Sequence, residues 1–504
     1  MSSPGALRVA IDLGAGSGRA LVGGAGDGVF HLAEAHRFHY APRQAAGRLR
    51  WDAARLIDGI DTGLRHAWDA AARRGAAIAS VGVDSWGVDY TLLDSDGRLV
   101  EEPVCYRDGR TSGVMDETFA FMPRAEIFAR TGTQFLPLNT IYQLRAHVRD
   151  GLPDRARHLL LMPDFCHHHL CGSLVSERTN ASTTQLLDAR TGHWDDGLFA
   201  RLGLPIGLMP GIVDAGTVVG TLRREFCRGH GIAPVPVVAP GTHDTASAVA
   251  GTPLRPGWAY VSSGTWSLVG IERDEPLLSA GVLNGGFTNE AGVCGTVRLL
   301  TNVMGLWLLE SCRREWEAEG RPQPLDALLA EVGRAGEPAG VIFPDDQRFF
   351  APASMVRELR DALRETGQQA PDDPVFLAKV VLDSLALRYG SIVKTIERVT
   401  GRAIPGIHIV GGGSLNGYLN QATADAAGRE VLAGPVEATA IGNLLVQEMS
   451  AGSIGSLADG RRLVAASFPP ARFEPRNPDG WARAARLFDQ IAPLLRELQD
   501  PEGL

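Results

Sequence analysis

Short apolar runs separated by glycine occur at the beginning of this chain. Residues 9–11 are apolar, Asp12 ends the run, a glycine-rich turn follows, and a second apolar run occupies residues 20–22. Short apolar runs bounded by glycine are typical of buried strands. We therefore predict a β-hairpin over residues 9–22, followed by a third antiparallel strand at residues 29–40.

Strands and amphipathic helices alternate along the rest of the chain. Further strands are predicted at residues 79–83, 90–93, 235–239, 258–262, 267–271, 407–410 and 430–433, and a turn at residues 94–97 should close a hairpin. Helical spacing predicts helices at residues 51–74, 247–250, 376–400, 415–427, 437–450 and 481–498. The stretch from about 110 to 200 is more irregular and more helical.

The arrangement of the first hairpin returns at residues 258–271, where a strand, a short polar loop and a second strand follow one another. The repetition lies in the arrangement and not in aligned identities, and it indicates a duplicated domain. A length of 504 residues also fits two or more domains. We predict an α/β fold with two domains, residues 1–248 and residues 249–490.

Composition and charge exclude several classes of partner. The chain is 44% hydrophobic and 21% charged, as ordinary globular proteins are. Its net charge of −9 argues against a nucleic-acid or acidic-membrane partner. It has no apolar run of membrane-spanning length, and its first residues lack the pattern of a leader, so we expect a cytoplasmic protein.

The cysteines, histidines and lysines allow a few specific expectations. The six cysteines contain no C-x-x-C pair and do not suggest a disulfide framework. Cys166, His167–His169 and Cys171 could hold zinc, but a short helix ending before Gly172 explains the segment more simply, because consecutive helical residues point in different directions. The chain has only two lysines, Lys379 and Lys394, and we expect both to be solvated on the helix at 376–400.

The first turn contains the elements of a phosphate site. Gly14, Gly16 and Gly18 let the backbone approach a ligand and direct N–H groups into one concavity, which suits phosphate. Asp12, at the end of a buried strand, suits a hydrated divalent cation. The pattern matches neither a dinucleotide fingerprint nor a Walker A loop. It predicts a nucleotide phosphate and Mg²⁺ site, although an ordinary glycine-rich turn is the alternative.

Two later segments could complete a phosphoryl-transfer site. Asp244 follows a predicted strand and begins a helix of small residues, so it could accept a proton from an attacking hydroxyl or simply cap the helix. Residues 411–413 are glycines between a strand and a helix, where a flat base or ribose can lie against the backbone.

Six motifs, in one order along the chain, resemble those of the FGGY carbohydrate kinases: DLGAGSGR, DSWGVDY, YRDGR, GTHDTA, SSGTWS and VGGGSLN. The finer match is to the rhamnulokinase branch, and it rests on residues 14–19, 86–89, 139–143, 179–186 and 302–309. The resemblance spans residues 8 to 450. It implies an actin-like/hexokinase (ribonuclease H-like) ATPase fold with an interdomain cleft.

The resemblance also implies a reaction, the phosphorylation of L-rhamnulose on its 1-hydroxyl by ATP with Mg²⁺. The residues that match the family's positions are Asp244 for the proton acceptor; Ala15, Gly16, Ser17, Gly18, Arg19 and Thr265 for ATP phosphates; Gly411 for adenosine; Gly87, His243, Asp244, Thr245 and Asn302 for the sugar; and Asp12 for Mg²⁺. Two positions depart from the pattern. Gly16 replaces a serine, and Glu310 stands where a glutamine near ATP is expected, so that it would repel phosphate unless a cation is present.

Other functions stay open on the sequence. A kinase for another ketose or deoxy sugar, such as xylulose or L-fuculose, would share these motifs. An actin-like or chaperone-like ATPase would share the phosphate hairpins without needing a sugar pocket. The residues themselves do not identify the sugar or the oligomeric state.

Overall fold

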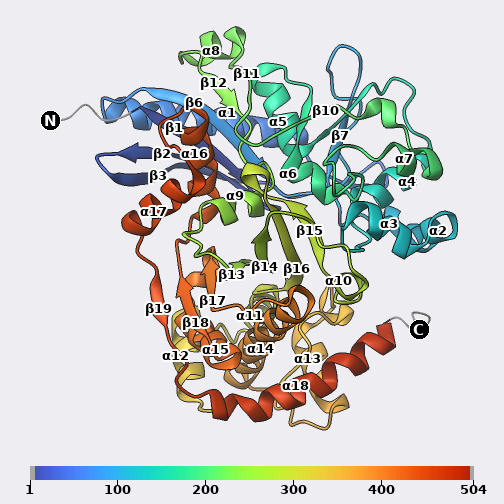
Figure 1. The fold of residues 1–504 in the computed structure, drawn as a ribbon, viewed down its shortest axis with the longest axis vertical. Coiled ribbons are helices and arrows are strands. Elements are labelled where there is room, and N and C mark those ends of the chain that lie inside the picture. The colour runs from blue at the N-terminus through green and yellow to red at the C-terminus, as the bar shows by residue number, and fades with distance from the viewer. Residues whose placement is uncertain (1–5, 500–504) are drawn as a thin grey trace. The chain divides into compact units, whose positions relative to one another are not determined.

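The computed structural model describes residues 6–499, which form two compact units (Figure 1). The first unit comprises Met1–Pro253, Glu272–Leu299 and Ala438–Phe468, and the second comprises Leu254–Ile271, Leu300–Glu437 and Pro469–Leu504. The chain therefore returns to the first unit twice. The predicted division into a sugar-binding part, residues 1–248, and an ATP-binding part, residues 249–490, concerns ligands and stays a prediction.

The first unit is built on a six-stranded mixed sheet in the order β11-β12-β6-β1-β2-β3. β1 pairs antiparallel with β2, and β2 pairs antiparallel with β3, which confirms the predicted hairpin and third strand. β6 lies parallel to β1 on the other side. The strands are β1 (Leu7–Leu13), β2 (Ser17–Gly26), β3 (Val29–His39), β6 (Ile78–Ser85), β11 (Val218–Thr221) and β12 (Pro236–Val238).

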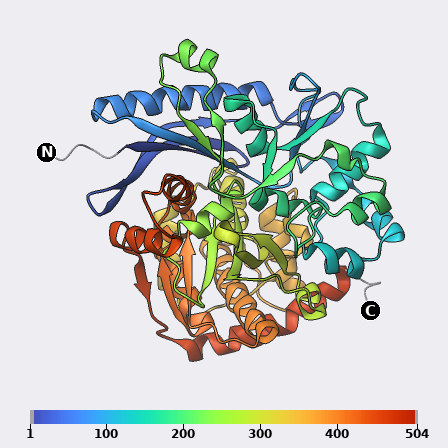
Figure 2. The same cartoon turned by 45° about the horizontal axis from the view of Figure 1, so that its top comes forward.

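Helices cover both faces of this sheet, and this burial explains the run of consecutive apolar residues in its first strand. Val9 and Ile11 pack in one core with α1 (Ala53–Arg73), which lies along the sheet in Figure 2. Ala10, from the opposite side of the pleat, packs with Ile441 and Leu444 of α16 (Ala438–Ser450). Because successive residues of a strand face opposite sides, a strand buried on both faces has consecutive apolar residues, as at residues 9–11. The run ends at Asp12, near the carboxyl end of β1.

A second core in the first unit is formed by helices and a two-stranded sheet. β7 (Tyr90–Leu93) pairs with β8 (His158–Leu161), and the turn at residues 94–97 adds only a single bridge between Leu93 and Leu99. The predicted hairpin is confirmed as a short one, because the Asp94 amide also donates to the Arg98 carbonyl at 2.9 Å and the Val100 amide to the Leu92 carbonyl at 2.8 Å, whereas the longer pairing of β7 is with the distant β8. The helices of this core are α2 (Val114–Phe121), α3 (Arg124–Thr131), α4 (Thr140–Asp150), α6 (Arg178–Ala181) and α7 (Asp196–Leu202). The neighbouring helix α5 (Met162–Cys171) packs instead in the core that contains α1.

The helix predicted around the cysteine and histidine cluster is confirmed as α5, which ends at Gly172 with a φ of 81°. Its three histidines have separate partners. His167 accepts a hydrogen bond from the amide of Val83, His168 contacts the carbonyls of Gly97 and Ser173, and His169 contacts Asp61. Each side chain is thus used in packing α5 against a different neighbour.

The other sheet has seven strands in the order β15-β16-β14-β13-β17-β18-β19. β13 pairs antiparallel with β14 and parallel with β17, just as β1 pairs with β2 and β6. The predicted repetition of the hairpin arrangement is therefore confirmed. The strands are β13 (Ala259–Ser263), β14 (Trp266–Arg273), β15 (Thr288–Ala291), β16 (Val297–Met304), β17 (Gly406–Val410), β18 (Glu430–Ala433) and β19 (Ala471–Phe473).

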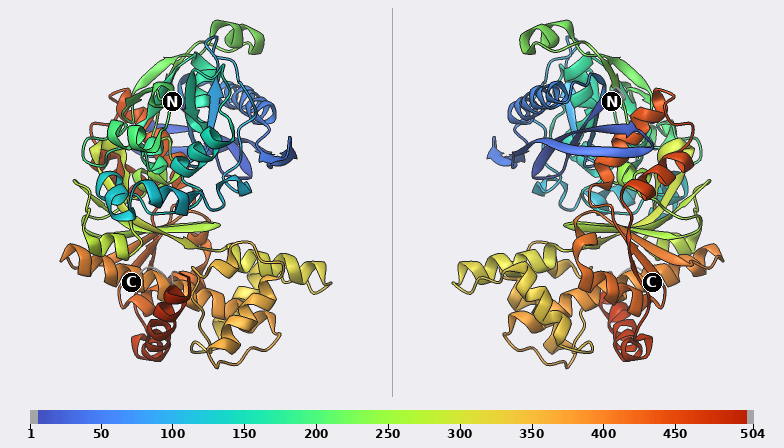
Figure 3. Two further views of the ribbon diagram at one scale, coloured as in Figure 1. Left: turned by 90° about the vertical axis from the view of Figure 1, so that its right-hand side faces the viewer. Right: turned by 90° about the vertical axis from the view of Figure 1, so that its left-hand side faces the viewer.

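Six longer helices belong to the second unit. In Figure 3 the helices coloured yellow to gold lie together beside the orange α14. The helices are α11 (Trp307–Ala318), α12 (Leu325–Arg334), α13 (Met355–Glu365), α14 (Pro374–Thr400), α15 (Gly417–Ala427) and α18 (Pro478–Gln499). α14 ends at Gly401, as predicted. α15 begins two residues later than predicted, because a 3₁₀ turn over Gly412–Leu415 precedes it and the Asn416 side chain accepts from the Leu419 amide.

Lys379 contradicts the expectation of a solvated lysine. Its side chain is buried, and its ammonium lies 3.0 Å from a carboxylate oxygen of Asp383 and donates to the hydroxyl of Tyr418. The spacing of four residues places Lys379 and Asp383 on one face of α14, and α15 covers that face. Lys394 is exposed, as expected.

The remaining strands and α-helices are β4 (Arg43–Ala45), β5 (Arg48–Arg50), β9 (Val175–Glu177), β10 (Gly211–Val213), α8 (Arg224–His230), α9 (Asp244–Ala250), α10 (Ala280–Asn284) and α17 (Leu457–Ser467). Among residues 6–499, none of the helices is both long and apolar enough to span a bilayer.

Candidate active site

Asp244 is the first residue of α9, which follows β12. Its Oδ1 atom accepts from the Thr245 amide at 2.6 Å and from the Thr245 hydroxyl at 3.1 Å. His243 occupies the N-cap position, and its side chain makes no capping hydrogen bond. A capping carboxylate would instead serve amides further along the helix, so the structure does not use Asp244 as the helix cap.

The small residues of α9 have a packing reason. A Cβ atom on Gly442 of α16 would collide with the carbonyl of Ser247, and one on Gly251 would collide with the carbonyl of Ala438. The two helices therefore approach backbone to backbone, which only small side chains allow. This close contact fixes where α9 begins, and with it the position of the Asp244 carboxylate.

Asp12 lies opposite Arg19 in β2 and opposite Asp84 in β6. The Arg19 guanidinium pairs with Asp12, and the Asn443 amide donates to Asp84 at 2.6 Å. The other Asp84 oxygen is buried and has no hydrogen-bond partner among the described residues. Burial raises the pKa of Asp84 well above its usual range, and the charges of Asp12 and Asp244 raise it further.

These carboxylates fit a magnesium ion, although the side chains that the structure describes include no group of three or more His, Cys, Asp or Glu arranged to hold a metal. Mg²⁺ is commonly bound through one or two carboxylates, with water and substrate phosphates completing its shell. Asp12 and Asp84 are adjacent, and the buried Asp84 oxygen lacks a partner. A cation near them would offset the repulsion between their charges.

The turn between β1 and β2 is held in shape by Tyr40, which the sequence analysis missed. The Tyr40 hydroxyl donates to the carbonyl of Gly14 at 2.5 Å, and its amide donates to the carbonyl of Gly16 at 3.3 Å. Ala15 and Gly16 form the exposed tip of the turn. Nothing lies within 4 Å of a Cβ atom built on Gly16, so the serine typical of the family would also fit there. Gly18 differs, because a Cβ atom on it would collide with the ring of Phe38.

A strained bend follows β6 at Gly87 and Val88. Val88 has a φ of 68°, a conformation that a β-branched residue adopts only when its surroundings impose it. The Thr183 hydroxyl accepts from its amide at 3.1 Å, and the Thr140 hydroxyl donates to its carbonyl at 2.7 Å. A Cβ atom on Gly87 would lie 2.8 Å from that same Thr183 hydroxyl, so glycine is required at this position.

The next residue, Asp89, is a buried carboxylate that organises two tryptophans. It accepts from the indole N–H of Trp51 at 2.7 Å and from that of Trp86 at 3.0 Å, and the side-chain amide of Gln143 also donates to it. Burial raises the pKa of Asp89 to about 6, although these hydrogen bonds favour the charged form. The W-G-V-D segment is thus a rigid bend and not a flexible loop.

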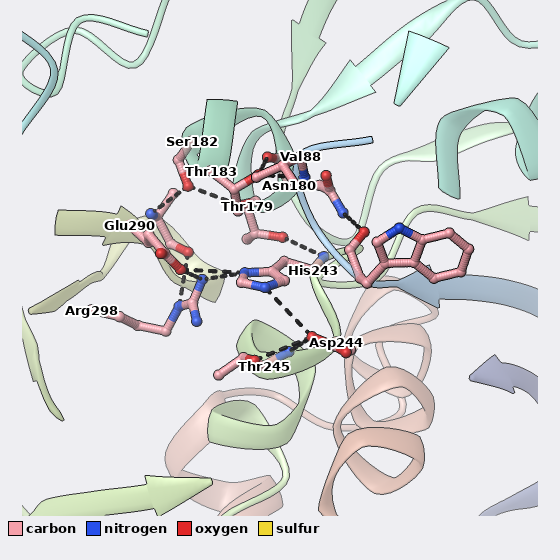
Figure 4. A network of polar contacts seen from close by, with 12 residues as sticks. Val88, Thr179, Asn180, Ser182, Thr183, His243, Asp244, Thr245, Glu290 and Arg298 are labelled. Atoms are coloured by element: carbon pink, nitrogen blue, oxygen red, sulfur yellow. Dashed lines mark hydrogen bonds and ion pairs between the residues drawn. The ribbon is translucent and has the colours of Figure 1, made fainter. Parts of the chain in front are cut away.

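A polar segment connects this bend to the loop that carries Asp244. Glu177 accepts from the amide of Thr242 at 2.9 Å and from its hydroxyl at 2.8 Å. The Thr179 hydroxyl accepts from the His243 amide, and the Asn180 side chain donates to the carbonyls of Trp86 and Thr242 (Figure 4). Residues 86–88 and 242–245 are therefore held together by side chains from a single segment.

His243 has buried charged neighbours that no motif or local pattern indicates. Its Nδ1 atom lies 3.0 Å from Nη2 of Arg298 and 3.3 Å from a carboxylate oxygen of Glu290 (Figure 4). Its Nε2 atom lies 3.5 Å from Oδ1 of Asp244. Burial raises the pKa of Asp244, and the charge of Asp12 adds to this, whereas His243 and Thr245 oppose it.

The second unit brings together three of the predicted nucleotide-binding segments. The amides of Leu306 and Trp307, at the start of α11, donate to the carbonyls of Gly264 and Thr265. Gly411 has a φ of 80°, and a Cβ atom on it would lie 2.7 Å from the carbonyl of Ser263. The turn at residues 263–265, the loop at 411–413 and the first turn of α11 are therefore neighbours.

Glu310 lies in the first turn of α11 and is half exposed. The Arg313 guanidinium pairs with it at 2.7 Å, and that of Arg314 lies 4.0 Å away. The cation that the carboxylate would need beside phosphate is thus supplied by its own helix. Asn302 lies in β16 and is partly buried.

The predicted site residues thus form two groups. Asp12, residues 15–19, Gly87 and residues 243–245 belong to the first unit, where strand pairing and the segment from Glu177 connect them. Thr265, Asn302, Glu310 and Gly411 belong to the second unit.

Comparison with known proteins identifies the family. Family models match residues 7–251 as the N-terminal domain and residues 259–451 as the C-terminal domain of the FGGY family of carbohydrate kinases. The chain is 43% identical over 489 residues to a rhamnulokinase of Pectobacterium carotovorum, covering 96% of each chain. It is 39% identical over 478 residues to a rhamnulokinase of Bacteroides thetaiotaomicron, covering 94% of this chain and 97% of the relative.

Solved structures agree on the fold. A xylulose kinase from Lactobacillus acidophilus superposes with a TM-score of 0.81 at 15% identity, covering 99% of both chains. A glycerol kinase from Plasmodium falciparum with ADP superposes with a TM-score of 0.79 at 15% identity, covering 97% of this chain and 98% of that one. Identity this low shows the fold alone, whereas the two family models and the near full-length relatives show that the chain belongs to the FGGY family of carbohydrate kinases.

Proposed function

We propose that this protein transfers the γ-phosphoryl group of ATP to the 1-hydroxyl of L-rhamnulose. The observation that carries the proposal is identity of 39 to 43% to several rhamnulokinases over nearly the full length of the chain. The likeness to xylulose and glycerol kinases, at 15% identity, does not extend beyond the fold and favours neither sugar.

Asp244 is the proposed proton acceptor. A sugar hydroxyl must lose its proton as it attacks phosphorus, and a carboxylate within reach of that hydroxyl can take it. The position of Asp244 at the start of α9, with its contacts on Oδ1, supports this role. The raised pKa of Asp244 also supports it, because a base is more effective when its pKa lies nearer the working pH.

The nucleotide is assigned to two sets of groups. Ala15, Gly16, Ser17, Gly18 and Arg19 would bind phosphate through backbone amides and one guanidinium, and the exposed tip of their turn supports this. In the second unit, Thr265 would contact phosphate, Gly411 would contact adenosine, and Glu310 would act together with its partner Arg313. Asp12, with Asp84 beside it, would hold Mg²⁺, which would neutralise part of the phosphate charge.

The sugar is assigned to Gly87, His243, Thr245 and Asn302, with Asp244 at the reacting hydroxyl. The rigid bend at residues 87–88 and its connection to the 242–245 loop support a preformed surface in the first unit. An ATPase that moves or holds other proteins has no need for such a surface.

A coupled assay of ADP release tests the proposal. L-rhamnulose, D-xylulose and L-fuculose are compared at equal concentration, with ATP alone as the background, and ³¹P–¹H coupling in the product identifies the phosphorylated carbon. We expect the highest kcat/KM with L-rhamnulose and a 1-phosphate product. A higher kcat/KM with another sugar would overturn the substrate, and sugar-independent ATP turnover would overturn the kinase.

A further inference from the structure

The buried pair Glu290 and Arg298 has no role in the reaction as described so far. Glu290 lies on β15 and Arg298 on β16, and their side chains form an ion pair of 3.1 Å. Both approach the same atom, Nδ1 of His243, at 3.3 Å and 3.0 Å respectively. Figure 4 shows the three side chains converging, with the opposite edge of the imidazole turned toward Asp244.

The chemistry of these groups determines which nitrogen of His243 carries hydrogen. A guanidinium can only donate, so Arg298 requires an acceptor at Nδ1, and the hydrogen of a neutral imidazole must then be on Nε2. If the ring were protonated instead, Nδ1–H would face Glu290 and Nε2 would still carry hydrogen. In either state an N–H group points from Nε2 toward Asp244.

The contacts of Asp244 all fall on one oxygen. Oδ1 accepts from the amide and hydroxyl of Thr245, and Nε2 of His243 approaches the same atom at 3.5 Å. Among the described residues, none donates to Oδ2. The Asp244 side chain is 31% exposed, so a ligand can reach this carboxylate, and Oδ2 is the oxygen that has no donor of its own in this part of the chain.

Stability alone is a poor explanation for the pair. Arg298 is completely buried, and its Nη1 atom has no hydrogen-bond partner in the described part of the chain. Replacing a buried ion pair by apolar side chains is often neutral or stabilising. The guanidinium is also fixed in direction, because its Nε donates to the carbonyl of Ala291 at 3.1 Å.

We propose that Glu290 and Arg298 are positioning residues that hold His243 with hydrogen on Nε2, so that Oδ1 of Asp244 is occupied by donors and Oδ2 is the oxygen that accepts the proton of the sugar hydroxyl. This inference rests on the proposed kinase function. Glu290 neutralises the buried charge of Arg298, and Arg298 selects the tautomer of His243 that carries hydrogen on Nε2.

The tautomer can be measured without any activity. Long-range ¹H–¹⁵N correlation spectra of the imidazoles, with His243→Gln to assign the signal, distinguish Nε2–H from Nδ1–H. We expect Nε2–H in the natural protein, and a loss of that preference in Arg298→Met because Nδ1–H can then donate to Glu290. An Nδ1–H tautomer in the natural protein, or an unchanged tautomer in Arg298→Met, would overturn the proposal.

Kinetics test the consequence for Asp244. We expect Arg298→Met to lower kcat by roughly 10- to 100-fold, as loss of an orienting partner commonly does, with the KM for ATP changed by less than about twofold. Arg298→Lys keeps a donor and should recover most of kcat. The double variant Glu290→Gln/Arg298→Met removes both charges, and provides the test if the single variant does not fold.

Arg8→Met is the matched control, because Arg8 forms another buried ion pair in the first unit, with Glu448. It should change stability and leave kcat and the His243 tautomer unaltered. An equal loss of kcat in both methionine variants would assign a structural role to Arg298 and overturn the proposal. If L-rhamnulose is not a substrate but the tautomer behaves as expected, the proposed function has failed and the positioning of His243 stands.

Discussion

Replacing Asp244 by asparagine separates its chemical role from its structural one. The amide oxygen of Asn can take the place of Oδ1 and accept from the Thr245 amide and hydroxyl, as the carboxylate does. The amide nitrogen then stands in place of Oδ2, where it carries hydrogens and cannot accept a proton. The variant Asp244→Asn therefore keeps the local hydrogen bonds and loses the base.

The expected magnitudes differ for activity and stability. A positioned base contributes about 10²- to 10⁴-fold to the rate, which corresponds to about 3–5 kcal/mol of transition-state stabilisation. The change in unfolding free energy should be under about 1 kcal/mol, since the contacts on Oδ1 persist. Burial of the Asp244 charge is unfavourable, as its raised pKa indicates, so the neutral amide should not destabilise the protein.

Three measurements check this reasoning. Coupled ADP release gives kcat, titration calorimetry gives the affinities for ATP and L-rhamnulose, and urea unfolding gives stability. Asp195→Asn is the control, because Asp195 is also a carboxylate at a helix start, where it caps α7 and accepts from the Leu198 amide at 2.9 Å. Near-natural kcat in Asp244→Asn, or an equal loss in the control, would refute Asp244 as the base.

Three further predictions concern pH, the phosphate turn and the buried lysine. Burial raises the pKa of Asp244, and a base must be deprotonated to act. As pH decreases, kcat/KM should therefore fall with a midpoint above the ordinary aspartate pKa of about 4. A pH profile with full activity at pH ~4 would contradict this prediction. Tyr40→Phe removes the hydrogen bond from the Tyr40 hydroxyl to the Gly14 carbonyl, which is worth about 1 kcal/mol, so the KM for ATP should rise about fivefold. An unchanged KM would show that the turn does not need this contact. Lys379→Met leaves the Asp383 carboxylate buried without its cation, so the unfolding free energy measured in urea should fall by about 3 kcal/mol. The double variant Lys379→Met/Asp383→Leu should recover most of the lost stability, and equal stabilities of the single and double variants would contradict the pairing.

The sequence predicts the strands and longer helices because buried strands are short apolar runs, and because apolar residues recur along a helix with a fixed period. Residues 9–11 and 20–22 are apolar since helices cover both faces of their sheet. The hairpin arrangement recurs at residues 258–271, where β13 pairs with β14. Asp84 could also have been predicted as a site residue from the sequence, because it is an acid at the end of a buried strand, as Asp12 is.

Two features of the fold depend on packing that no local pattern reveals. The turn at 94–97 closes a short hairpin as predicted, but no local pattern shows that β7 also pairs with β8, a strand that begins at residue 158. Lys379 has the spacing of a solvated residue on a helix, but α15 covers that position. Periodicity describes one element at a time and does not say what packs against it.

The sequence by itself determined the two hairpins, the helix that begins at Asp244 and, through its motifs, the family. Only the tertiary structure decided which groups surround the reacting carboxylate. Tyr40, Glu290 and Arg298 belong to no local pattern, and they reach the Gly14–Gly16 turn and His243 because strand pairing brings distant segments together. A hydrogen bond or an ion pair depends on distances of about 3 Å between atoms, and such distances are set by the packed chain and not by the order of its residues.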